Sequence, residues 1–178
     1  MRATHRYVTK HVVIDDAAID AATNAAALVE PIWFTSGIYD GPEQYKESTA
    51  GFSQQQQYLY AVILYRHEVD NGGHDQFFFN SSGVVWPTAR AGLHELGLNE
   101  AVAILDEAVA RLGCSTCLDT QSRRRQLDLV EPDFEDLDTR FYQLQKVVNF
   151  DDLLYHYVLQ NRSAFYFEGD IQVLELTK

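Results

Sequence analysis

The sequence predicts an all-α protein, a single compact multi-helix domain whose tail also allows a small C-terminal β-hairpin. Two segments carry this prediction, because their apolar residues recur at intervals of three and four, the spacing of one helix face. The first set is Leu98, Val102, Leu105, Val109 and Leu112, and the second is Phe134, Leu137, Phe141, Leu144 and Val148. The 178 residues are 46% hydrophobic. No Gly/Ser/Pro-rich linker divides them, so we expect one domain over residues 1–178 with its core at about 15–165.

The N-terminal part predicts one helix followed by a loop. Asp15 or Asp16 is suited to cap a helix that reaches Val29. Pro31 disfavours its continuation, because proline cannot donate a backbone hydrogen bond. The glycines and proline between residues 33 and 51 indicate a loop that holds at most one short helix.

Residues 53–70 predict a central helix that is buried on most sides. Eight consecutive apolar residues, 58–65, would also fit a buried strand, but the length of the whole segment favours a helix. Residues 71–73, Asn-Gly-Gly, are expected to end it, because Asn and Gly accept the left-handed conformation. A second short helix, 74–80, would follow at an angle and stop at residues 81–83.

The last third of the chain predicts three helices and an ambiguous tail. Gly113 is placed to end the first periodic helix, and Pro132 is suited to the first position of the second. A further helix is expected from Phe150 to Asn161. In the tail, residues 164–167 and 171–176 could pair as a hairpin across Glu168-Gly169-Asp170.

The charge balance is the most unusual feature of the composition. There are 26 acidic residues against 14 Lys and Arg, a net charge of −12. Such a protein repels nucleic acid and anionic membranes and attracts basic partners, although many proteins are acidic for solubility alone. The longest apolar run has eight residues, far fewer than the roughly 20 that span a bilayer. With no signal-peptide core and two cysteines, we expect a cytoplasmic protein.

Acidic residues concentrate at the start of the helix predicted over residues 132–148. Five fall off its apolar stripe and are expected to project outward: Glu131, Asp133, Glu135, Asp136 and Asp138. Neighbours three or four residues apart on a helix lie about 5–6 Å from each other, comparable to the ~3.4 Å phosphate repeat of one nucleic-acid strand. The set would grow if the fold adds Asp15, Asp16, Asp20, Asp151 and Asp152. The alternative is that acids in a first turn only stabilise the positive end of the helix dipole.

Residues 70–83 contain an Asn-Gly-Gly turn, a Gln-Phe-Phe core and an Asn-Ser-Ser-Gly exit. This pattern resembles the signature of the DNA-mimic protein family first known from Neisseria, and residues 137–142 extend the similarity, which covers about residues 15–165. The resemblance implies a helical homodimer whose negative surface imitates duplex DNA and blocks the DNA-binding face of a transcription factor. His74 stands where that pattern has an apolar or aromatic residue. The family offers no catalytic residue or cofactor to carry over.

The motif residues themselves indicate structural roles. The glycines permit a sharp turn, the phenylalanines supply core, and the amides are expected to satisfy buried backbone groups. The residues concerned are Asn71, Gly72, Gly73, Gln76, Phe77, Phe78 and Asn80.

A metal-dependent hydrolase is the enzymatic alternative, based on His67, Glu68, His74 and Asp75. Adjacent residues point about 100° apart on a helix, so His67 and Glu68 do not form the paired-histidine motif of zinc proteases. His94 and His156 would join them only through the fold, and we expect no metal and no catalysis.

Two further clusters have unremarkable explanations. The Cys114–Cys117 pair has no second pair to complete a zinc site, and it follows a helix end, so two ordinary thiols are expected. Residues 123–125, Arg-Arg-Arg, indicate a solvated face or a contact with acids across a dimer interface. The sequence therefore predicts an acidic protein that competes with DNA for a basic transcription factor. The alternative is a protein–protein adaptor or immunity-type protein whose acidity serves solubility.

Overall fold

The computed structural model describes residues 7–113 and 116–174. Its α-helices are α1 (Asp16–Ala21), α2 (Glu30–Thr35), α3 (Pro42–Thr49), α4 (Gln54–Phe79), α5 (Trp86–Glu95), α6 (Asn99–Arg111), α7 (Thr120–Val130), α8 (Glu135–Val147) and α9 (Phe150–Gln160). Short 3-10 helices are η1 (Ala25–Val29), η2 (Ser81–Val85) and η3 (Arg162–Phe165), and the strands are β1 (Tyr7–Ile14) and β2 (Phe167–Leu174). The all-α class with one small β element is confirmed.

The central element is α4, which confirms a helix rather than a strand for the apolar run. It begins at a capping box, in which the Ser53 hydroxyl accepts from the Gln56 N–H at 3.1 Å and the Gln56 side chain accepts from the Ser53 N–H at 2.9 Å. Residues 59–65 are all buried, because elements from both halves of the chain pack around them.

The Asn-Gly-Gly turn bends α4 as the sequence predicts. Gly73 adopts the left-handed region with φ 72°, and Gly72 is also non-helical. The helical path is therefore interrupted, and residues 74–79 continue in a new direction, which confirms the second short helix.

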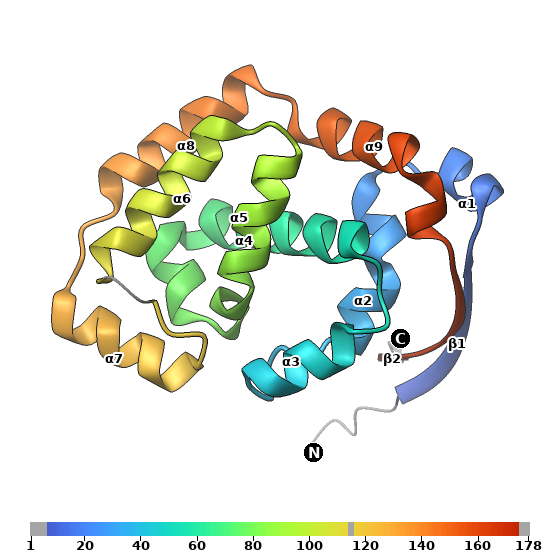
Figure 1. The fold of residues 1–178 in the computed structure, drawn as a ribbon, viewed down its shortest axis with the longest axis horizontal. Helices are drawn as coiled ribbons and strands as arrows, with labels where there is room; N and C mark the ends of the chain where they lie inside the picture. Colours follow the sequence, from blue (N-terminus) through green and yellow to red (C-terminus); the bar gives the residue numbers. More distant parts are fainter. Residues whose placement is uncertain (1–6, 114–115, 175–178) are drawn as a thin grey trace, which may run out of the picture.

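The other helices surround α4 (Figure 1). Helix α5 packs closely along it at Gly92, where a Cβ would lie 3.0 Å from the Tyr58 carbonyl oxygen. Helices α6 and α8 lie beside each other at one end of the molecule, and α9, α1 and the β1–β2 ribbon lie at the other.

The N-terminal region is more broken than the predicted single helix. Asp15 does cap α1, accepting from the Ala18 N–H at 2.8 Å. The helix ends at Ala21, and Asn24 caps a separate turn, η1. Pro31 was expected to stop a helix but lies in the first turn of α2, where the absence of its N–H costs nothing.

The later helices match the prediction with one shift. Helix α6 and its end before Gly113, with φ 104°, are confirmed, as is α9. Helix α8 begins at Glu135 and not at Pro132, because residues 131–134 form the connection between α7 and α8. Glu131, the C-cap of α7, adopts the left-handed conformation with φ 45°.

The β element differs from the expected local hairpin in its pairing. Strand β2 runs through residues 168–170 without a turn and pairs antiparallel with β1, with Tyr7 opposite Leu174 and Ile14 opposite Phe167. Residues 164–165 belong to η3 instead. The ribbon thus joins two distant parts of the chain and buries Ile14 and Ile171 against the helices.

No helix in the described part of the chain is both long and apolar enough to cross a membrane.

Candidate functional site

The ten carboxylates expected to form the partner surface lie on α1, on α9 and around the start of α8. In Figure 1, α8 lies at the upper left of the molecule, and α9 and α1 lie at the upper right. Nine of the ten are exposed: Asp15, Asp16, Asp20, Glu131, Asp133, Glu135, Asp136, Asp151 and Asp152. We call this set the acidic edge.

Asp138 is the exception, and the expectation that it projects outward is wrong. It is half-buried, and its Oδ1 accepts from the His74 backbone N–H at 2.9 Å and lies 2.5 Å from His74 Nδ1. The kink at Gly73 aims these donors at α8, and a Cβ on Gly73 would collide with the Asp138 carboxylate. Asp138 therefore fastens α8 to the kink in α4.

Two arginines hold acids of α6 and α8 in fixed orientations. Arg111 donates to both carboxylate oxygens of Asp136, at 2.5 and 2.8 Å, and to Glu107 at 2.6 Å. Arg140 donates to Glu107 at 2.8 Å and to Glu100 at 2.9 Å. Hydrogen bonds from Arg111 lower the pKa of Asp136 to about 2, and those from Arg111 and Arg140 lower the pKa of Glu107. The network contains three acids and two bases, so it remains net negative.

The other end of the acidic edge is also partly paired. Arg162 contacts Asp16 at 3.0 Å and also bonds Asp20, and Arg66 donates to Asp151 at 2.6 Å. These pairs orient the carboxylates but offset part of their charge.

The remaining members of the acidic edge have no salt bridge within residues 7–113 and 116–174: Asp15, Glu131, Asp133, Glu135 and Asp152. Asp15, Asp133 and Asp152 accept hydrogen bonds from backbone or amide groups, which fix their positions without neutralising them. The acidic edge therefore combines oriented ion pairs with carboxylates that keep their full charge.

Two of the motif residues, Gln76 and Asn80, and the nearby Ser82 hold the side chain of Glu68. Its Oε2 accepts from the Gln76 and Asn80 amides at 2.8 and 2.9 Å, and its Oε1 accepts from the Ser82 hydroxyl at 2.6 Å. The expectation that Gln76 and Asn80 satisfy backbone groups through their side chains is therefore wrong, and Asn71 is exposed. The core role of Phe77 and Phe78 is confirmed, since both are fully buried.

His74 fits the core in spite of its polarity. Its ring lies among the rings of Tyr65, Phe134 and Phe141. Its Nε2 lies 2.8 Å from the Tyr65 hydroxyl, and its Nδ1 is bonded to Asp138. The imidazole thus takes the place of an aromatic residue while both nitrogens are satisfied.

Arg123 corrects the prediction of a solvated arginine face. Its side chain is fully buried and donates to the carbonyl oxygens of Phe78, Asn80, Cys117 and Leu118 at 2.6–3.0 Å. Burial lowers its pKa to about 10. The guanidinium joins α7 to the end of α4, and no local pattern distinguishes this arginine from its two neighbours.

The cysteine and metal predictions are only partly covered by the described residues. Cys114 lies outside them, and Cys117 is a free, half-buried thiol. Within residues 7–113 and 116–174, no group of three or more His, Cys, Asp or Glu side chains is arranged to hold a metal ion.

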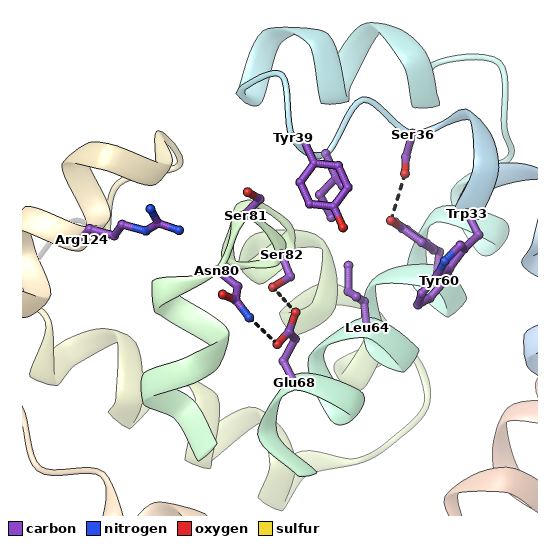
Figure 2. Close-up of a pocket in the computed structure, with 11 residues that line it drawn as sticks. Trp33, Ser36, Tyr39, Tyr60, Leu64, Glu68, Asn80, Ser81, Ser82 and Arg124 are labelled. Atoms are coloured by element: carbon purple, nitrogen blue, oxygen red, sulfur yellow. Dashed lines mark hydrogen bonds between the residues drawn. The ribbon is translucent and has the colours of Figure 1, made fainter. Parts of the chain in front are cut away.

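An unexpected cleft of about 470 Å³ opens between α2, α4, η2 and α7 (Figure 2). Aromatic side chains of Trp33, Tyr39 and Tyr60 line one side, Glu68 lies between, and Arg124 lies across from them. We call it the aromatic cleft. The only sequence signal was two aromatic residues, Trp33 and Tyr39, in a segment interpreted as a loop.

The comparisons with known proteins give one match. The model of the family described as "DMP19-like protein" matches residues 50–161, more than half of the chain, including the motif and all of the helices α4 to α9. Searches of curated proteins and of solved structures found no match. The chain therefore belongs to the DMP19-like family, the DNA-mimic family that its Asn-Gly-Gly motif resembles.

Proposed function

We propose that this protein binds the DNA-binding surface of a basic transcription factor through its acidic edge and thereby excludes DNA. The observation that supports this most is the set of exposed carboxylates at the start of α8, on α9 and on α1 in a member of a DNA-mimic family. A negative surface of this kind accelerates encounter with a basic partner and matches its Lys and Arg side chains.

The arginine network supports the proposal because it holds carboxylates rigidly. DNA presents its phosphates at fixed positions, so side chains that imitate them should lose little freedom on binding. Arg111 fixes Asp136 with two hydrogen bonds, and the α8–Asp138–His74 contact fixes the helix that carries it. We also propose that the protein is a homodimer, as the family resemblance implies, and that it acts in the cytoplasm without enzymatic activity. Light scattering tests the dimer.

The test is competition with DNA, using four unpaired carboxylates of the acidic edge. The variant carries Glu131→Gln, Asp133→Asn, Glu135→Gln and Asp152→Asn. Immobilised protein is exposed to DNA-binding proteins from a cell lysate, and bound proteins are displaced with duplex DNA. We expect the unaltered protein to retain DNA-displaceable proteins, less so as salt rises, and the variant to retain at least about tenfold less.

A matched control removes the same charge elsewhere. Asp40, Glu43, Glu47 and Asp75 are exposed and have no salt bridge in the described part of the chain, so changing them to Asn and Gln removes the same amount of negative charge. If both quadruple variants lose binding alike, only net charge matters and the acidic edge is not a specific surface. If captured proteins are not displaced by DNA, the adaptor or immunity-type alternative replaces mimicry.

A further inference from the structure

The aromatic cleft contains a carboxylate whose charge has no cationic counterpart. Glu68 is held by three neutral donors, the side chains of Gln76, Asn80 and Ser82. No Lys, Arg or His within residues 7–113 and 116–174 forms a salt bridge with it. Its position is therefore fixed, while its negative charge stays available on the floor of the cleft (Figure 2).

Two exposed aromatic rings line the same cleft as this carboxylate. Trp33 is 41% exposed and Tyr39 is 86% exposed. Trp33 meets Tyr60 edge-on at 5.4 Å between ring centroids, and the Tyr60 hydroxyl is fixed 3.0 Å from Ser36 Oγ. The negative faces of such rings attract cations, most strongly when the cation leaves water.

Arg124, on the opposite side, is already engaged. Its Nε–H donates to the Phe79 carbonyl at 2.7 Å, and its guanidinium lies 4.2 Å from the centroid of the Phe79 ring. Its charge disfavours a second cation at that end, so a cationic ligand would lie on the other side of the cleft, near Trp33, Tyr39 and Glu68.

We propose that the aromatic cleft binds a basic side chain of a protein ligand, with its guanidinium or ammonium group between the Glu68 carboxylate and the rings of Trp33 and Tyr39. The volume of about 470 Å³ leaves room for the backbone that carries this group. None of the residues that line the cleft belongs to the acidic edge. The inference therefore goes beyond the proposed DNA mimicry and does not depend on it.

The binding test uses Trp33 as the reporter. The chain has two tryptophans, so Trp86→Phe leaves Trp33 as the sole source of indole fluorescence. The probes are the N-acetyl amides of arginine, lysine, citrulline and glutamate. We expect saturable changes with arginine and lysine, and binding at least about tenfold weaker for citrulline, the neutral counterpart of arginine. Equal binding of arginine and citrulline, preference for glutamate, or no binding of any probe would each overturn the proposal.

Variants then locate the site, with helical circular dichroism measured for each. Tyr39→Leu removes an exposed ring and Glu68→Gln removes the charge. Each should weaken arginine binding several-fold, whereas Glu43→Gln, an exposed change outside the cleft, should not. If Trp86→Phe unfolds the protein, the indole N–H resonance of Trp33 is followed by NMR in the protein that retains Trp86. If Glu68→Gln unfolds the protein, Tyr39→Leu locates the site. Unchanged binding in Tyr39→Leu, or an unmoved Trp33 resonance, contradicts the proposal. These probes involve neither DNA nor a transcription factor, so failure here is distinct from failure of mimicry.

Discussion

Asp138→Ala should destabilise the protein far more than a change at its exposed neighbours on α8. The substitution removes the acceptor of both the His74 backbone N–H and its imidazole Nδ1, and His74 has no exposed side-chain surface. A buried donor that loses its acceptor costs about 1–3 kcal/mol. Because the Asp138 side chain is 21% exposed, water can reach part of the vacated space. We therefore expect a loss of about 2–4 kcal/mol for the two donors together.

The measurement is urea unfolding at pH 7, followed by helical circular dichroism. Asp138→Asn keeps one acceptor oxygen and should be destabilised less than Asp138→Ala. The control is Glu135→Ala in the first turn of α8, which is exposed and forms no side-chain hydrogen bond or salt bridge with the residues described. If Asp138→Ala and Glu135→Ala unfold at the same urea concentration, Asp138 does not fasten α8 to the kink.

Three further predictions concern groups whose surroundings are equally well defined. Gly73→Ala should lower the free energy of unfolding by more than about 1 kcal/mol, because Gly73 has φ 72° and a methyl group would collide with a carboxylate; an unchanged unfolding curve would show that the kink can relax. The NMR chemical shift of the Asp136 carboxyl carbon should report a titration of this group with a pKa of about 2. Since its folded pKa lies below the unfolded value, its contribution to stability is present above pH 3.8 and is lost as pH falls towards 2. Arg111→Gln should bring the titration back towards 3.8, and an unshifted midpoint would exclude Arg111 as its cause. Arg123→Met should cost more than about 2 kcal/mol, because it leaves buried carbonyl oxygens without donors, whereas the exposed Arg125→Met should change the urea midpoint little; equal effects would contradict the buried role.

Strong local patterns made much of the helical architecture predictable. The apolar spacing in α6, α8 and α9 and the Asn-Gly-Gly turn in α4 depend only on neighbouring residues, and each is confirmed. Helices α5 and α7 were missed because their apolar faces are small: in α7, only Leu127 and Arg123 are buried. Because arginine is polar, its burial in α7 leaves no sign in the spacing of apolar residues along the sequence.

The candidate site was less predictable because pairing is a tertiary property. The sequence places Asp136 and Asp138 on the same helix two residues apart, yet one meets Arg111 on the surface and the other meets His74 in the interior. Those partners lie 25 and 64 residues away along the chain. Likewise, nothing local to Glu68 indicates that the exit of the motif returns to hold its carboxylate.

The β1–β2 ribbon has a consequence for the order of folding. Its cross-strand partners are separated by long stretches of chain, 159 residues for His11 and Asp170, so the strands can meet only at a high cost in chain entropy unless the helices have first drawn them together. We expect the ribbon to form last and open first. Its backbone amides should then exchange with deuterium through a local opening that leaves α4 protected.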